Sequence, residues 1–182
     1  MQWSVHSPSA FIQDRAASLL PDWSCAIEPV LIESVLIVLQ PCDRVLLERT
    51  LETEAQKERL RQNFLEIGAM VVLRLVEQGY RADLFDPSSG FPVYSSPGHT
   101  RLDDVAIARA CLGYPVSRSG GCAVILHPLW GSAVYPSTVV SSAPPWVIEA
   151  VAASLLGCPY RPTPYAVAHS AIATGGRIDW VS

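Results

Sequence analysis

The chain has 182 residues, of which 49% are apolar and 16% charged, and its formal net charge is −4. This composition is too apolar for a disordered protein, and the length suits one domain with a single core. The negative charge argues against a nucleic-acid partner, because phosphate binding needs a surplus of Lys and Arg. The apolar runs are far shorter than the roughly 20 residues that a membrane span requires.

Residues 1–25 match neither a secretory signal nor a transit peptide, because they contain acidic residues and lack a sustained apolar run. We therefore expect a cytoplasmic protein. The cysteines are odd in number, widely spaced and without a CxxC pair, which favours reduced thiols over a disulfide framework or a zinc site. They are Cys25, Cys42, Cys111, Cys122 and Cys158.

Three parts are expected along the chain: an irregular segment over residues 1–29, an α+β domain over 30–157 and a Pro-rich tail over 158–182. A short helix is predicted in the first part, over Ala10–Leu20. The run Val30–Leu39 is rich in Val, Ile and Leu, which is typical of a mostly buried strand. The second part is therefore expected to contain the sheet.

A long helix is predicted over Thr53–Gln78. The segment Thr53-Glu-Ala-Gln56 fits a capping box, in which two side chains bond free backbone amides of the first turn. Apolar residues then recur every three or four positions, and Gly79 supplies a left-handed stop. The second half of the helix is apolar almost all round, so we expect other elements or another subunit to cover it on several sides.

Turn residues and a second helix follow. The segment Asp86-Pro-Ser-Ser-Gly90 fits the turn of a hairpin between two short strands. A helix is predicted over Leu102–Leu112, where Asp103 and Asp104 are favourably placed at its positive N-terminal end. Gly113 is expected to end this helix.

The last predicted elements are two strands and a helix. Cys122–Leu126 is apolar on both alternating faces, which is typical of a central strand. Ala133–Val140 is a further strand, in which Pro136 is tolerated only at an edge or a bulge. A helix over Trp146–Leu156 follows two prolines.

Cys122 is the candidate functional residue. Gly120 and Gly121 precede it, so its thiol is expected at the start of a strand where the backbone is unobstructed on one side. A thiolate is a soft metal ligand and a nucleophile, and free backbone amides favour it. The alternative is that Cys122 is a small buried apolar residue, which is common for free cysteines.

Other polar residues have structural interpretations. His127 is five positions from Cys122, so in an unbroken strand the two side chains lie on opposite faces and share neither a dyad nor a metal. We expect His127 to anchor the turn at Pro128. Asp83 and Asp86 also face opposite ways, which argues against a paired-carboxylate site. The chain has no GxGxxG, Walker or GxSxG motif.

Several blocks, taken in order, resemble one family. They are Gly79-Tyr-Arg-Ala-Asp83, Asp86-Pro-Ser-Ser-Gly90, Leu112-Gly-Tyr114, Gly120-Gly-Cys-Ala-Val-Ile125, His127 and Leu129-Trp-Gly131. Together they are similar to the methylmalonic aciduria and homocystinuria type D family of intracellular cobalamin-trafficking proteins. The resemblance runs from about Val30 to Ala143 and includes the long helix.

The resemblance implies both a fold and a function. The fold would be an α+β, nitroreductase-like sandwich with a mixed sheet and one long amphipathic helix, without flavin. The protein would be an adaptor and not an enzyme. It would bind a cobalamin-processing protein of the type C kind, handle cobalamin as a transient cargo, and help to route it to methionine synthase and methylmalonyl-CoA mutase.

The resemblance also implies a site. In the family, a cysteine of a Gly-Cys-Cys segment is implicated in sulfur–cobalt coordination. The corresponding residues here are Gly120, Gly121 and Cys122, so one of the paired cysteines is replaced. These three residues would contact cobalamin, with Cys122 as the cobalt ligand. Two alternatives stay open: a flavin-dependent reductase of the same fold, and a thiol enzyme that uses Cys122.

Overall fold

The structure is a computed structural model, and it describes residues 1–25, 28–119 and 121–158. One sheet has the strand order β1-β2-β6-β3, and a second, smaller sheet pairs β4 with β5. The strands are β1 (Gln2–His6), β2 (Ser34–Pro41), β3 (Ala82–Leu84), β4 (Val116–Ser119), β5 (Cys122–Ile125) and β6 (Val134–Ser141). The helices are α1 (Ala10–Leu19), α2 (Pro21–Ser24), α3 (Leu51–Glu77), α4 (Asp104–Leu112) and α5 (Pro145–Leu156).

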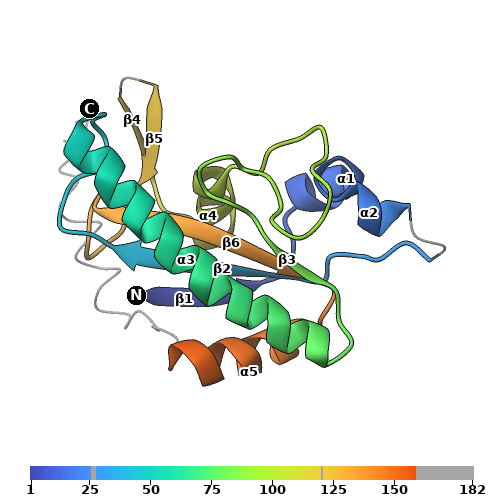
Figure 1. The fold of residues 1–182 in the computed structure, drawn as a ribbon. Helices are drawn as coiled ribbons and strands as arrows, with labels where there is room; N and C mark the ends of the chain where they lie inside the picture. Colours follow the sequence, from blue (N-terminus) through green and yellow to red (C-terminus); the bar gives the residue numbers. More distant parts are fainter. Residues whose placement is uncertain (26–27, 120, 159–182) are drawn as a thin grey trace, which may run out of the picture.

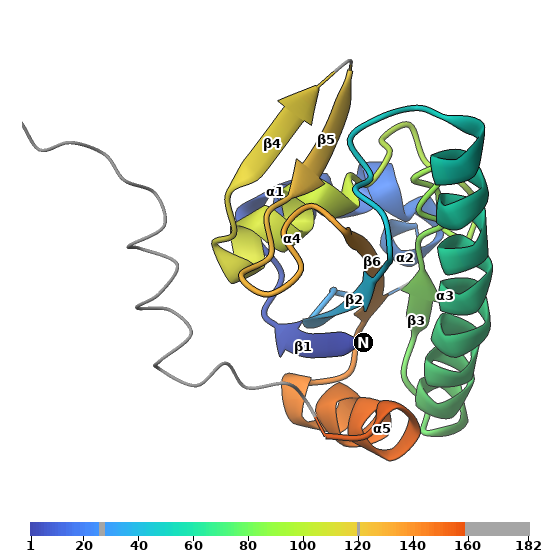
Figure 2. The same cartoon turned by 90° about the vertical axis from the view of Figure 1, so that its left-hand side faces the viewer.

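The four-stranded sheet lies between two layers of helices. Helices α3 and α5 cover one face, and α1 and α4 lie on the other, as Figure 1 and Figure 2 show. One core cluster therefore packs Phe64 and Ile148 against Leu36, and the second packs Ile12 and Ile107 against Ile37. The predicted α+β class with one long helix is confirmed, with a layer of helices on each face of the sheet.

The expectation of a mixed sheet was wrong. Every pairing that the described residues make is antiparallel: β1 with β2, β2 with β6, and β3 with β6. Strands β2 and β3, which α3 connects, run parallel to each other, as a helical crossover favours. However, β6 lies between them and pairs with both in the antiparallel sense.

The N-terminal segment was expected to be irregular, but it forms a strand of the main sheet. Strand β1 pairs with β2 from Gln2 opposite Leu39 to His6 opposite Val35. Its sequence, Gln-Trp-Ser-Val-His, alternates polar and apolar residues, which is the pattern of a half-buried strand. That signal was available and was missed. The predicted helix near Ala10 is confirmed as α1. The proposed boundary at 29/30 stays a prediction, and residues 159–182 of the expected tail lie outside the described residues.

Helix α3 begins earlier than predicted. Thr50 is the N-cap: its hydroxyl accepts a hydrogen bond from the Thr53 amide at 3.2 Å, and the Thr53 hydroxyl accepts one from the Thr50 amide at 2.9 Å. The capping box is therefore Thr50 with Thr53, and not Thr53 with Gln56. The predicted stop at Gly79 is confirmed by its φ of 87°.

The expected cover over the second half of α3 is incomplete. One side of this half packs on the sheet and on α5, where Phe64, Val71 and Leu75 are buried. Met70 and Leu73, however, are 46% and 57% exposed. Within the part of the chain that the structure describes, no element covers this stripe.

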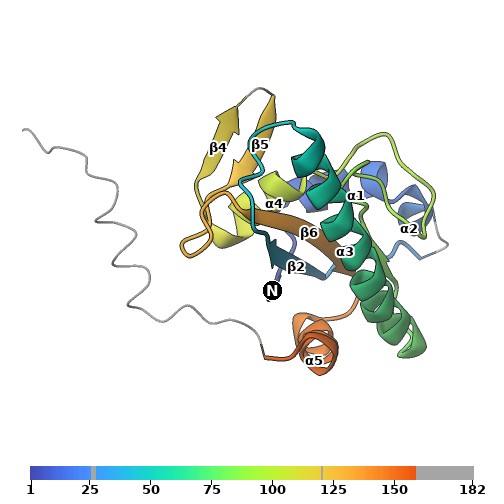
Figure 3. The same cartoon turned by 60° about the vertical axis from the view of Figure 1, so that its left-hand side comes forward.

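Strand β5 was predicted to be a central strand, but it lies outside the main sheet. It pairs with β4 to form a hairpin that projects beyond the main sheet, close to the loop before α3 (Figure 3). Its apolar residues are buried because the hairpin packs on α4, where Ile125 contacts the second core cluster. The periodicity could not separate burial under a helix from burial between strands.

The hairpin predicted around Asp86 does not form, because residues 91–94 make only an isolated bridge, between Phe85 and Pro92. The remaining predicted elements are close to those observed. Helix α5 begins at Pro145, and Gly113, with a φ of 71°, ends α4. Strand β3 pairs only with Val139–Ser141, so β6 is unpaired on that side at Pro136, as the proline requires. The turn at Asp86 is closed by a bond of 2.7 Å from the Gly90 amide to the Asp86 carbonyl.

Asp83 holds the loop after β3. Its fully buried carboxylate accepts hydrogen bonds from four backbone amides. They are those of Leu84, Val93, Tyr94 and Ser95, at 2.7 to 3.1 Å. As predicted, Asp83 and Asp86 do not form a pair, because Asp86 instead accepts two bonds from Arg61 at 2.6 and 2.7 Å.

The Asp83→Asn variant is expected to lower the free energy of unfolding by about 2 kcal/mol, because one acceptor oxygen becomes an NH2 group that faces a buried amide donor. Urea denaturation followed by circular dichroism measures this loss. Asp43→Asn is the matched control, because Asp43 is exposed. Equal stabilities of the two variants would show that the four amides do not depend on the carboxylate.

Candidate functional site

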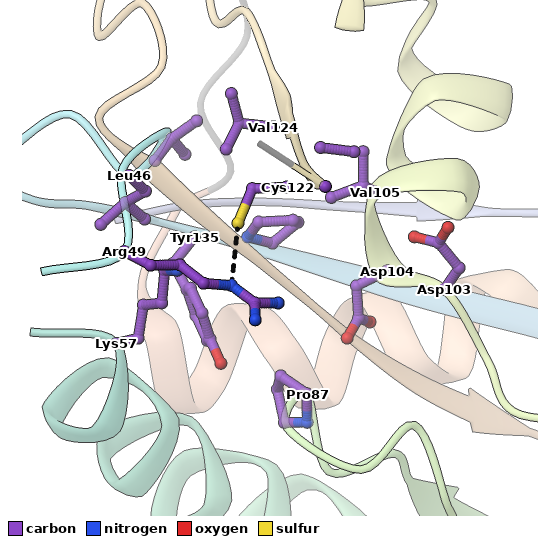
Figure 4. Close-up of a pocket in the computed structure, with 14 residues that line it drawn as sticks. Leu46, Arg49, Lys57, Pro87, Asp103, Asp104, Val105, Cys122, Val124 and Tyr135 are labelled. Atoms are coloured by element: carbon purple, nitrogen blue, oxygen red, sulfur yellow. Dashed lines mark hydrogen bonds between the residues drawn. The ribbon is translucent and has the colours of Figure 1, made fainter. Parts of the chain in front are cut away.

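A cavity of about 200 Å³ lies beside Cys122 (Figure 4). Strand β5, the N-terminal end of α4, the beginning of β6, the loop before α3, the first turns of α3 and the turn at Pro87 surround it. Its lining combines apolar, cationic and acidic side chains. They include Leu46, Arg49, Lys57, Asp104, Cys122, Val124 and Tyr135.

Cys122 is half-buried, and its sulfur faces the Arg49 side chain. The Arg49 Nε donates a hydrogen bond to the Cys122 Sγ at 3.4 Å. Gly121 also lines the cavity, and its φ of 81° is one that residues with a side chain rarely adopt. Two of the three predicted site residues thus lie at the cavity, and Gly120 lies outside the described residues.

Arg49 was not among the predicted site residues. It lies in the loop between β2 and α3, 73 positions from Cys122, and no motif marks it. The pKa of its exposed guanidinium is raised, first by the hydrogen bond to Cys122 and then by Coulombic attraction to that sulfur. Only the tertiary structure brings this cation to the thiol.

Asp104 is a second cavity residue that was not among the predicted site residues. Asp103 is the N-cap of α4 and accepts a bond from the Ala106 amide at 3.0 Å. Asp104 lies in the first turn of the helix, as predicted, but it is buried and accepts a bond of 2.6 Å from the Thr138 hydroxyl. Burial raises the pKa of Asp104 to about 8, so its carboxyl is mostly neutral at pH 7. A buried acid with a raised pKa in a cavity is a frequent feature of functional sites.

His127 anchors a turn, as predicted, and does not reach Cys122. Its Nδ1 accepts bonds from the amides of Leu129 and Trp130 at 3.1 and 3.3 Å, which makes Nε2 the protonated nitrogen that donates to the Gln2 side chain at 2.8 Å. Its ring stacks on Trp130 with centroids 4.1 Å apart. Burial lowers the pKa of His127 to about 4, so it is neutral at pH 7.

A family model described as "Methylmalonic aciduria and homocystinuria type D protein" matches residues 3–151. The chain belongs to this family. It is 29% identical over 112 residues to the cobalamin trafficking protein CblD of Gallus gallus, a match that covers 62% of this chain and 38% of that protein. Identity to the CblD protein of Homo sapiens is 32% over 94 residues, covering 52% of this chain and 32% of that one. The chain thus matches well under half the length of these curated relatives.

Among solved structures, this chain is similar to epoxyqueuosine reductase from Bacillus subtilis. The sequence identity is 15%, and the match covers 79% of this chain and 41% of that one. The TM-score is 0.33, which is too low to support a common fold or function.

Two further observations concern the described residues of this CblD-family chain. They contain no group of three or more His, Cys, Asp or Glu residues that could hold a metal ion. None of their helices is long and apolar enough to cross a membrane.

Asp104→Asn is expected to stabilise the protein increasingly as pH rises. The folded-state pKa of about 8 lies above the ordinary value of 3.8, so the wild type loses stability between about pH 4 and pH 8 while the unfolded chain alone ionises. Urea denaturation at pH 4, 6 and 8 should show a variant-minus-wild-type difference that grows by at least about 2 kcal/mol. Asp14→Asn, at an exposed position, is the control. A constant difference for Asp104→Asn across this range would contradict a buried neutral acid.

His127→Gln tests the anchor at the turn. Because the folded-state pKa of about 4 lies below the ordinary 6.5, the wild type loses stability as pH falls from about 6.5 to about 4, while only the unfolded chain gains the proton. The variant lacks this titration and should be less stable than the wild type at pH 7, by a margin that narrows towards pH 4.5. Thermal unfolding measures the margin. His99→Gln, at an exposed position, is the control.

Proposed function

We propose that this chain is a cobalamin-trafficking adaptor that presents Cys122 to the cobalt of a cobalamin held by a second protein. The observation that carries the proposal is the position of the Cys122 sulfur. It is half-buried, it lines a cavity, and it lies on a hairpin that projects from the main sheet. Membership of the CblD family supports cobalamin as the cargo.

The ligand set at Cys122 suits a metal that brings its own ligands. A single thiolate with no other metal-binding cluster in the described residues is a poor site for a free ion. Cobalt in a corrin ring has its equatorial positions filled by the ring, so a protein needs to supply only an axial ligand. A soft thiolate can take that position.

The size of the cavity supports an adaptor over a binding protein that encloses its cargo. Ligand pockets usually measure about 300 to 1,000 Å³, even for molecules much smaller than a corrinoid. The cavity beside Cys122 holds about 200 Å³. Most of the cobalamin surface must therefore be covered by a partner. We propose that this partner is a cobalamin-processing protein of the type C kind. The cobalamin would then be delivered to methionine synthase or methylmalonyl-CoA mutase, and the adaptor itself would act in the cytoplasm.

The remaining features of the proposal follow from the same family. The layered α+β fold would be a nitroreductase-like sandwich that carries no flavin and has no turnover of its own. Gly120 and Gly121 would be cobalamin contacts, and apart from its chain neighbours no atom lies within 4 Å of the Cβ that another residue would add at Gly121. A purified protein that is yellow from bound flavin would favour a reductase instead.

The deciding experiment mixes the protein with cob(II)alamin, with and without a processing protein. The expected result is a thiolate-type absorption spectrum that appears with the partner and disappears in Cys122→Ser. Cys25→Ser is the control, because Cys25 is an exposed thiol. The same spectrum in Cys122→Ser, or no change with any partner, would remove the cobalt contact. Co-purification with the partner would then test the adaptor role separately.

A further inference from the structure

We propose that the cavity beside Cys122 binds a primary carboxamide group, and that Asp104 is the residue that pairs with it. The edge of a corrin ring carries acetamide and propionamide side chains, so the inference rests on the proposed function for the source of the carboxamide. It deepens that function, because a second contact would orient the corrin relative to the sulfur. The pairing itself can be measured with a small amide and without cobalamin.

One oxygen of the Asp104 carboxyl has no partner. Asp104 is 9% exposed, and its Oδ1 accepts the bond of 2.6 Å from the Thr138 hydroxyl. Its Oδ2 makes no hydrogen bond with the described residues, yet it is not sealed in the interior. Among the described residues, the unpaired side-chain oxygens that are sealed belong to Ser9 and Ser137. The Asp104 Oδ2 is therefore open to the cavity that Asp104 lines (Figure 4).

The described residues of the lining do not supply the missing bond. Figure 4 shows one hydrogen bond among them, from Arg49 to Cys122. The Lys57 ammonium pairs at 2.9 Å with Glu54, which lies outside the lining. A polar atom in a side chain that is nine-tenths buried is costly to leave unpaired. The Asp104 carboxyl is thus a place where a ligand can form a hydrogen bond that the protein does not.

This carboxyl presents a donor and an acceptor side by side. Because burial raises its pKa, Asp104 is mostly neutral at pH 7. Its Oδ1 accepts from Thr138, so the proton is on Oδ2. Oδ2 can then donate, and Oδ1 keeps a second lone pair. A primary carboxamide matches both, since its carbonyl oxygen accepts from Oδ2 and its N–H donates to Oδ1.

The charges around the cavity argue against a charged ligand group. Arg49 and Lys57 line the cavity and would repel an ammonium group. A carboxylate group has no N–H to donate to Asp104. It would also lie in the same cavity as the carboxyl of Asp103, which is exposed and caps α4. An uncharged group that both donates and accepts avoids these costs.

The size and position of the cavity suit one side chain of a larger ligand. Its volume of about 200 Å³ is too small for a corrin ring, but a carboxamide on a short methylene chain fits. Asp104 begins α4 and Cys122 begins β5, so the two contacts come from different elements that meet at one cavity. A few polar groups placed in this way fix the orientation of a ligand.

The first experiment follows the backbone amide NMR signals of the protein near neutral pH. The probes are propionamide, propionate and propylamine, which share a short alkyl chain and differ in their polar group. Propionamide is expected to shift the signals of Val105 and Val124, which line the cavity, and to bind at least about fivefold more tightly than the charged probes. Asp104→Leu should weaken propionamide about tenfold. Asp104→Asn, whose side chain also donates and accepts, should stay within about twofold of the wild type.

Equal binding of the three probes, or tighter binding of propionate, would overturn the inference. An unchanged affinity for propionamide in Asp104→Leu would do the same. The ranking of the probes on the wild-type protein decides the matter even if Asp104→Leu does not fold, which circular dichroism shows.

The second experiment uses cob(II)alamin held by the processing protein. The concentration of loaded partner that gives half of the thiolate-type spectrum should rise about fivefold in Asp104→Leu and little in Asp104→Asn. A half-saturation that is the same in all three proteins would overturn the assignment of the carboxamide to the cargo. Failure of the proposed function looks different: propionamide would still depend on Asp104, but no thiolate-type spectrum would form with any partner.

Discussion

The antiparallel pairing of β2 with β6 is the constraint on which the candidate site depends. The register runs from Ser34 opposite Ser141 to Pro41 opposite Val134. Beyond it, the Cys42 amide still bonds to the Ala133 carbonyl at 3.0 Å, so β2 exits and β6 enters at the same end of the sheet. The loop that leaves β2 carries Arg49, and the hairpin that precedes β6 carries Cys122. The register of two strands thus brings a guanidinium to a thiol 73 positions away.

Buried polar residues hold the surroundings of the site, and they do so in different ways. The Asp83 carboxylate and the His127 ring are satisfied by backbone amides and a glutamine, so each one fixes a loop at little cost in desolvation. Asp104 has one hydrogen bond, from Thr138, and no cation as a direct partner among the described residues. It stays buried by remaining protonated. Of the three, only Asp104 lines the cavity beside Cys122.

The small cavity and the single thiol suit the proposed adaptor role, because both limit the contact with the cargo. A protein that must release its cargo gains from a contact that is specific but limited, since one exchangeable ligand can be replaced in a single step. Cys122 is the one cysteine in the sequence of this hairpin, so it is the sulfur that the hairpin can offer.

The sequence alone determined the features that depend on neighbours along the chain. Apolar spacing with Gly79 and Gly113 was enough for the long helix and for α4, because a helix is held by contacts three and four residues apart. Local blocks were enough for the family, and they made Cys122 the candidate functional residue. The tertiary structure decided the antiparallel sheet, the outlying position of β5, the burial of Asp104 and the contact of Arg49 with Cys122. These depend on which strands pair across a hundred residues, and such pairing leaves no periodic signal in either segment.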